Sequence, residues 1–350
     1  MAERRRDGDE GRGAARLLAG ARERVRVARA ELALPERLRL GERDRIAVSA
    51  MLTALVRSVE DELRSALASV FAVPGREPLH AALTSASVAI AGPVLDAAPD
   101  FPEASLLSLL LRRAEEHRMQ RAVGGEGGLL LQLAGDRDDA IAGEAMAIRI
   151  VQSGRLDPFQ EPRLAREELP AETMHGLVWT IAAALRRYMA REHRLPGGEA
   201  DEAIAAAAAA FLAEYDEGRG PDPAALRLAR RLDAGGRLTD QMLERAAADG
   251  ALPLLLAGLA VRTSLDPRAA WEILSDPQRR GPVLLLRAAD VARDQAASIL
   301  LRLAARDPEA AAPLLDQFDT TDPGEARRLL RLWQLDPAYR AAVARLSEAA

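Results

Sequence analysis

The chain has 350 residues, of which 49% are hydrophobic, 3% aromatic and 29% charged, and its formal net charge is −5. It contains no cysteine, which excludes disulfides and thiolate metal sites, and no lysine, which excludes a Walker-type phosphate loop. The dominance of Ala and Leu over aromatic residues favours helices over sheets, and the length predicts two or three domains.

The N-terminal segment is basic, whereas the middle of the chain is acidic. Residues 1–45 carry 13 Arg and 9 acidic residues, a net charge of +4, and residues 46–221 carry 17 and 26, a net charge of −9. We expect residues 1–13 to form a disordered basic tail. In residues 14–34, apolar side chains recur every three or four positions, which predicts an amphipathic helix with an arginine-studded face. The nearest partner of opposite charge for this arm is the protein's own acidic middle.

The next predicted helix spans residues 42–57 and is apolar on nearly all sides, so that it would have to be covered on most of its surface. Its polar residues form one narrow stripe: Arg45, Ser49, Thr53 and Arg57. Ser58 followed by Asp61 resembles a variant capping box and predicts that another helix begins there. Breaks at Pro74, Gly75 and Pro78 then precede a helix at residues 79–90.

The central part of the chain alternates further helices with irregular stretches. Helices are predicted at residues 102–118, 129–134 and 139–152, and again at 174–189 after a proline-rich connection at 156–170. Six consecutive alanines at residues 205–210 indicate high helix propensity and close packing. The clearest linker contains Gly218, Gly220, Pro221 and Pro223.

Asp is followed directly by Pro seven times, which marks helix starts because Asp is a preferred N-cap and Pro suits the next position. Starts at Asp222, Asp266 and Asp307 are 44 and 41 residues apart, near the period of two-helix HEAT-type repeats. Asp157 stands apart, because it opens an irregular connection. The remaining marks are Asp276, Asp322 and Asp336.

These elements predict an all-α fold, a HEAT-like α-solenoid of short antiparallel helix pairs with no sheet. The predicted division is a tail at residues 1–13, an N-terminal HEAT-like domain at 14–156, an irregular connection with central helices at 157–217, a linker at 218–223 and a C-terminal helical-repeat domain at 224–350.

Three blocks carry a resemblance to a known family: LGERDRIAVSAMLTALVRSVEDELRSALASVFA, LVWTIAAALRRYM, and RLTDQMLERAAADGALPLLLAGLAVRTSLDPRAAWEILSD followed by LLLRAADV. In this order they resemble the uncharacterised bacterial DUF2336 family, of alphaproteobacterial type, over most of residues 40–305. The resemblance implies HEAT-like helical repeats in a bacterial cytoplasm. It provides no catalytic residues, and it implies a regulatory or signalling role.

Two Glu-x-x-His steps, Glu77 to His80 and Glu172 to His175, suggest a di-metal carboxylate site, which needs such steps inside a four-helix bundle. Pro78 and Pro170 instead place both steps at helix beginnings, where the dipole favours Glu. His80, with Thr84 four residues on, also faintly resembles a histidine phosphoacceptor, without an acidic neighbour. We therefore assign no metal ligand to these residues.

The other candidate residues have structural interpretations. His117 and His193 each follow a Glu near an expected helix end, where a cation is stabilised. The glycines of residues 124–128 lack the spacing of a dinucleotide fingerprint and indicate a turn. Three tryptophans are expected in the core, although a partly exposed one would be a good anchor for a partner: Trp179, Trp271 and Trp333.

The sequence gives no targeting or membrane signal. Acidic residues from Asp7 onwards follow Arg4 to Arg6 where a signal peptide needs an apolar region, and the longest apolar run, at residues 251–261, is too short to cross a bilayer. We therefore expect a cytoplasmic protein.

The leading hypothesis is a non-enzymatic helical-repeat module that binds another protein, as a regulatory or signalling scaffold. It assigns no catalytic, cofactor-binding or metal-binding residue, no cofactor, no small-molecule substrate and no membrane partner. The least favoured alternative is the di-metal enzyme. The other is a nucleic-acid-binding regulator that uses the arginines of the N-terminal arm: Arg4, Arg5, Arg6, Arg12, Arg16, Arg22, Arg26 and Arg29.

Overall fold

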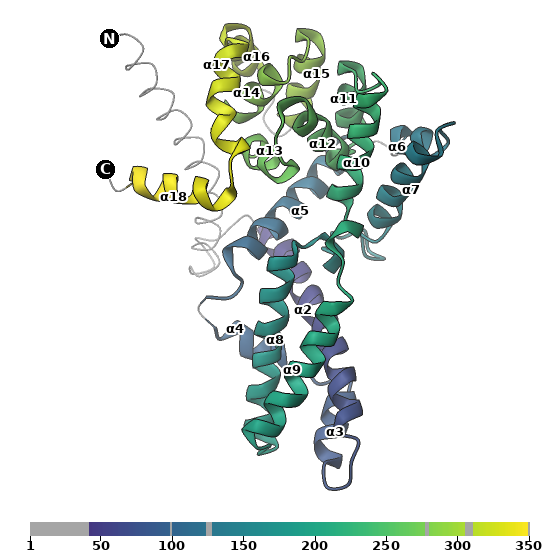
Figure 1. The fold of residues 1–350 in the computed structure, drawn as a ribbon, viewed down its shortest axis with the longest axis vertical. Coiled ribbons are helices and arrows are strands. Elements are labelled where there is room, and N and C mark those ends of the chain that lie inside the picture. Colours follow the sequence, from purple (N-terminus) through teal and green to yellow (C-terminus); the bar gives the residue numbers. More distant parts are fainter. Residues whose placement is uncertain (1–41, 99, 124–127, 277–279, 305–310, 349–350) are drawn as a thin grey trace. The chain divides into compact units, whose positions relative to one another are not determined.

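The structure is a computed structural model that describes residues 42–98, 100–123, 128–276, 280–304 and 311–348. In these ranges it contains helices and no strand, which confirms the predicted all-α class (Figure 1). One isolated antiparallel bridge joins Leu156 and Pro162. The predicted tail, the helix at residues 14–34 and the arginine arm lie outside the described residues.

The chain divides into two compact units, and both are discontinuous in sequence. Among the described residues, unit 1 contains Glu115–Ser153 and the chain from Pro221 onwards, and unit 2 contains the chain up to Ala114 and Gly154–Gly220. The step from Gly220 to Pro221 falls inside the predicted linker. The sequence instead predicts consecutive domains, and their boundaries stay a prediction.

Unit 2 is built around the long helix α2, Glu42–Val70, which packs against α3, α4, α8 and α9. The other elements of unit 2 are α3 Glu77–Thr84, α4 Ala91–Asp96, the start of α5 Ala104–Val123, α8 Ala171–Glu192 and α9 Gly197–Ala213, with 3-10 turns η2 Arg166–Glu168 and η3 Glu217–Arg219. Because α8 and α9 are joined by a short turn, they pack side by side along α2 (Figure 1).

Two predictions about α2 are wrong. The helix does not restart at Ser58, whose Oγ donates to Leu55 O at 2.8 Å and which has no proline or glycine beside it to break the helix. Nor is α2 covered on most sides. It buries one stripe, which includes Met51, Leu55 and Val59, whereas Ile46 is 57% exposed. The helix is therefore amphipathic.

Unit 1 contains a row of helices in which neighbours pack in the order α7, α10, α12, α14 and α17. Its most deeply buried member is α12, in which every residue from Leu252 to Ala260 is buried. The apolar run at residues 251–261 is thus a core helix. The bounds are α6 Gly128–Ala134, α7 Asp139–Ser153, α10 Pro221–Ala234, α11 Asp240–Ala248, α12 Leu252–Thr263, α13 Pro267–Leu274, α14 Arg280–Ala288, α15 Arg293–Leu303, α16 Ala311–Thr320, α17 Pro323–Leu330, η5 Arg331–Gln334 and α18 Pro337–Glu348.

The predicted repeat register is wrong, because three helices and not two lie between Asp222 and Asp266: α10, α11 and α12. Successive helices from α11 to α14 instead begin 12 to 15 residues apart, since each is only about two to three turns long. Two glycines allow these helices to approach closely. A Cβ at Gly258 would lie 2.5 Å from Leu243 Cδ2, and one at Gly281 would lie 1.8 Å from Ile273 O.

Most of the Asp-Pro marks begin helices, as predicted. Asp266 and Asp322 are the N-caps of α13 and α17, where their carboxylates accept from Arg268 N and Glu325 N, each at 2.8 Å. Asp276 accepts from the first amides of α14, and Asp336 from those of α18. Asp222 lies one residue inside α10, and Asp307 lies outside the described residues.

Candidate functional site

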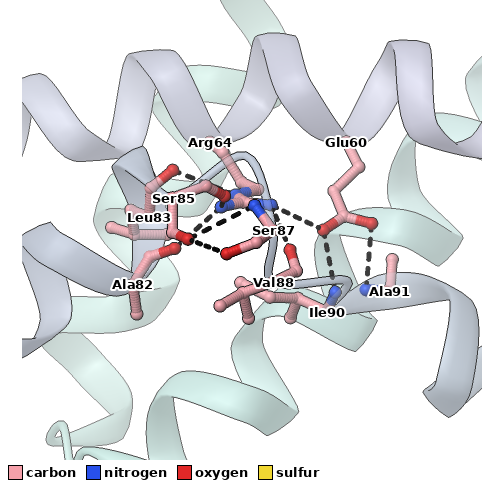
Figure 2. Close-up of polar contacts among 9 residues, drawn as sticks. All are labelled: Glu60, Arg64, Ala82, Leu83, Ser85, Ser87, Val88, Ile90 and Ala91. Atoms are coloured by element: carbon pink, nitrogen blue, oxygen red, sulfur yellow. Dashed lines mark hydrogen bonds and ion pairs between the residues drawn. The ribbon is translucent and has the colours of Figure 1, made fainter.

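In unit 2, Glu60 and Arg64 form a buried ion pair, one turn apart on the buried face of α2 (Figure 2). Each residue is only 4% exposed, and the guanidinium Nη1 lies 3.3 Å from Glu60 Oε1. The Glu60 carboxylate also accepts from Ile90 N and Ala91 N, both at 3.0 Å, which are the first amides of α4. A carboxylate at this helix end satisfies amides that lack partners within the helix.

Arg64 binds the opposite end of the neighbouring helix. Its nitrogens donate to Leu83 O at 3.0 Å, to Ala82 O at 2.7 Å and to Ser85 O, at the C-terminus of α3. A further bond reaches Val88 O at 2.7 Å in the loop between α3 and α4. With Glu60, these acceptors match the five N–H donors of a guanidinium. The pair therefore holds α3, the loop and α4 on α2, and it retains no donor for a ligand.

A second buried pair shapes the irregular connection after residue 153. Arg155 and Glu168 form an ion pair at 2.5 Å, with side chains 3% and 6% exposed. Arg113, 1% exposed, donates to Arg155 O at 3.0 Å and to Arg163 O at 3.1 Å. These bonds pin both ends of a loop that begins at Arg155 and ends at Arg163, whose backbones are also joined by Arg163 N to Arg155 O at 2.8 Å.

The tip of this loop presents the most exposed large apolar side chain that the structure describes, Phe159 at 84%. We call residues 157–161 the Phe159 turn. Asp157 Oδ1 accepts from Phe159 N at 2.8 Å and from Glu161 N at 2.9 Å, and Asp157 N donates to Glu161 O at 2.9 Å. Gln160 adopts a left-handed backbone with φ of 65°. Asp157 thus organises a turn rather than a helix start, as its sequence context indicates.

The four candidate metal ligands do not form a site. Among the residues that the structure describes, no three His, Cys, Asp or Glu side chains come together as a group that could hold a metal. Glu77 lies in the first turn of α3, and its carboxylate accepts from Gly75 N at 3.0 Å, which lowers the pKa of Glu77. His80 Nδ1 contacts Ala68 O at 3.1 Å, so that this nitrogen already has a backbone partner.

The second Glu-x-x-His step is exposed at the start of α8. Glu172 lies in the first turn, as predicted, and His175 Nε2 accepts the indole N–H of Trp179 at 3.0 Å. Trp179 is 38% exposed, so the expectation of core packing is wrong for this tryptophan, whereas Trp271 and Trp333 are buried at 8% and 2%. The apolar residues around Trp179 recur at helical spacing along α8, but Trp179 itself lies on the solvent-exposed side of the helix.

The two histidines expected near helix ends differ. His193 is the C-cap of α8 and its backbone N–H donates to Met189 O at 3.2 Å, as predicted. His117 lies inside α5, which continues to Val123, so its predicted place at a helix end is wrong. The helix passes His117 because no glycine or proline follows until Gly124.

Unit 1 has a polar junction that sequence analysis also missed. Asp240, in the first turn of α11, binds Arg262 of α12 through Oδ1 and accepts from Ala292 N, the N-cap of α15, at 2.8 Å through Oδ2. Burial alone would raise the pKa of Asp240, but the bonds from Arg262 and Ala292 outweigh it and lower the pKa. One carboxylate thus joins three helices.

The sequence did not single out these charged residues, because charged residues on an amphipathic helix are expected on its exposed face. Glu60 and Arg64 do carry a signal, since they occupy positions in register with the buried Val56, Val59 and Leu63 of α2. Phe159 carries a weaker one, as an aromatic residue between two prolines in a connection without periodicity.

None of the described helices combines the length and the apolar character needed to cross a membrane. No curated protein and no solved structure was found to match the chain. A family model described as "Uncharacterised protein conserved in bacteria (DUF2336)" matches residues 125–331, which include the second and third of the resembling blocks and exclude the first. Because this match covers more than half of the 350 residues, the chain belongs to the DUF2336 family.

Proposed function

We propose that the protein is a non-enzymatic helical-repeat module that binds another protein, and that it acts as a regulatory or signalling scaffold. The observation that supports this most is the Phe159 turn. Its aromatic side chain is 84% exposed, although hydrogen bonds to Asp157 hold the backbone around it in place. A flexible loop would be free to fold such a side chain back onto its own surface.

The turn has the physical properties of a binding anchor. A phenylalanine that becomes buried removes about 150–250 Å² from water, at about 25 cal/mol per Å². The bonds from Asp157 fix the backbone before a partner arrives, so that little conformational entropy is lost on binding. Arg113, Arg155 and Glu168 hold the base of the loop to the body of unit 2. Aromatic side chains, phenylalanine included, are enriched at protein–protein interfaces.

Affinity capture from the native cell, followed by mass spectrometry, tests this proposal. The full chain should retain a protein reproducibly, and Phe159→Ser should lose it, because the polar side chain removes the anchor and leaves the turn intact. Leu301→Ser is the matched control, since Leu301 is 59% exposed on α15 of unit 1. The recovered protein should then bind the purified chain about 30-fold more weakly after Phe159→Ser, equivalent to about 2 kcal/mol.

Two outcomes contradict the proposal. The first is that no protein is retained while a small molecule is. The second is that a nucleic acid is retained, that salt weakens the binding steeply, and that deletion of residues 1–34 abolishes it. The second outcome supports the nucleic-acid-binding alternative.

A further inference from the structure

Three residues lie on one exposed face of α8: Glu172, His175 and Trp179. They occupy positions i, i+3 and i+7, so successive members are neighbours on one face of the helix. The indole N–H of Trp179 donates to His175 Nε2 at 3.0 Å, and the two rings are tilted by 58° with centroids 6.2 Å apart. All three residues are exposed.

This hydrogen bond requires a neutral imidazole. Trp179 Nε1 is a donor only, so His175 Nε2 must offer its lone pair, and the ring proton must sit on Nδ1. When the imidazole is protonated, both ring nitrogens carry hydrogen and two donors face each other. The bond is then lost and the Trp179 ring is released from its partner.

The protonated side chain has an alternative partner one turn earlier. Glu172 lies three residues before His175, the spacing at which a carboxylate and a cation attract each other on a helix surface. Protonation thus both breaks the bond to Trp179 and favours a move toward Glu172.

Charged residues on the elements around α8 also bear on His175. The elements packed against α8 are α2, α4 and α9. Glu60 and Arg64 of α2 bind each other, Asp201 of α9 pairs with Arg186, and α4 carries only Asp96 as a charged residue. On the segment before α5, Glu103 oxygens lie 3.6 and 3.7 Å from a Cβ placed on the adjacent Gly176, which adds a second negative charge near the histidine.

We propose that Glu172, His175 and Trp179 form a proton-controlled switch on the surface of α8. In its neutral state His175 holds Trp179 in one orientation, and in its protonated state it pairs with Glu172 and releases the indole. Histidine side chains as a class change charge between about pH 5 and pH 8, so this is the range in which the switch is tested. This inference does not depend on the proposed function, which rests on Phe159.

Nuclear magnetic resonance of the full chain tests the switch. We expect the three tryptophans to give separate indole N–H signals, and the signal that disappears in Trp179→Phe identifies Trp179. We expect this signal to move between pH 8 and pH 5 while the signals of the buried Trp271 and Trp333 stay constant. In His175→Gln the movement should be absent, and in the matched control His193→Gln it should persist.

A third variant separates the switch from a simple hydrogen bond. In Glu172→Gln the protonated state loses its partner, so the pH midpoint of the Trp179 response should fall by about 0.2–0.4 units. The proposal is overturned if the Trp179 signal does not respond to pH while the His175 ring titrates, or if the response survives His175→Gln. An unchanged midpoint in Glu172→Gln would overturn the role of Glu172. Because all three residues are exposed, each variant should keep the helical circular dichroism of the parent.

Discussion

The carboxylate of Glu60 and the guanidinium of Arg64 lie one turn apart on α2 and cap opposite ends of two successive helices (Figure 2). Glu60 binds the amino end of α4, and Arg64 binds the carboxyl end of α3. Each charge matches the dipole of the helix end that it contacts. The pair therefore adds to the burial of Leu79, Leu83 and Leu95 in holding two short helices on α2, since isolated helices of this length are unstable.

Replacing Arg64 by methionine should destabilise the protein by about 3–5 kcal/mol, because Glu60 and the carbonyls of α3 lose their buried partner. Urea denaturation followed by circular dichroism measures this change. The double variant Glu60→Met with Arg64→Met should lose less than the two single variants together, because no buried charge is left alone.

The control for this prediction is Arg186→Met, which removes the exposed pair with Asp201, whose side chains are 48% and 53% exposed. We expect almost no change in its urea midpoint, because solvent screens surface pairs. A loss for Arg64→Met as small as that for Arg186→Met would show that the buried network does not hold α3 and α4 on α2.

The parts of this structure that local rules determine could be predicted from the sequence. Asp266 and Asp322 cap helices because the N-cap bond is made within three residues of the chain. The all-α class follows from composition and periodicity, which need no knowledge of partners. His193 at the end of α8 belongs to the same group.

The parts that depend on distant partners could not be predicted. Arg64 reaches carbonyls 18 to 24 residues away, and Asp240 reaches an amide 52 residues away, so that no local pattern reveals either bond. The predicted two-helix repeat period is wrong for a related reason. Asp-Pro marks only some helix starts, and Thr239 caps α11 without a following proline, so the interval between marks contains an extra helix.

The approach of α14 to α13 leads to a sharp prediction about glycine. Gly281→Ala should destabilise the protein by about 2–3 kcal/mol, because the new Cβ would lie 1.8 Å from Ile273 O and 2.9 Å from Asp276 Cβ. The matched control is Gly143→Ala in α7, where the new Cβ would meet nothing within 4 Å apart from its chain neighbours and the backbone of its own helix.

At Gly143 the same substitution should stabilise the protein by about 0.5–1 kcal/mol, because alanine costs less backbone entropy than glycine inside a helix. Thermal denaturation of both variants measures the two effects. Equal responses at the two positions would contradict the close contact between α13 and α14.

The last prediction concerns Asp136 of unit 1, which precedes α7. The side-chain hydrogen bonds from Arg237 lower the pKa of Asp136 to about 2, with a further contribution from the backbone N–H of Asp138 at 3.0 Å. Arg237→Gln should move this pKa up toward its ordinary value of 3.8. A carboxyl titration by nuclear magnetic resonance measures the shift, and Arg230→Gln, at an exposed position on α10, should leave it unchanged.

The sign of the effect on stability follows from the depressed pKa. Asp136 is charged in the folded state where the unfolded chain is already protonated, so the contribution of the pair is complete above about pH 4 and disappears as the pH falls toward 2. The difference in unfolding free energy between the parent and Arg237→Gln should therefore be constant from neutral pH down to about pH 4 and should shrink below it. A difference that grows as the pH falls would contradict the pairing of Asp136 with Arg237.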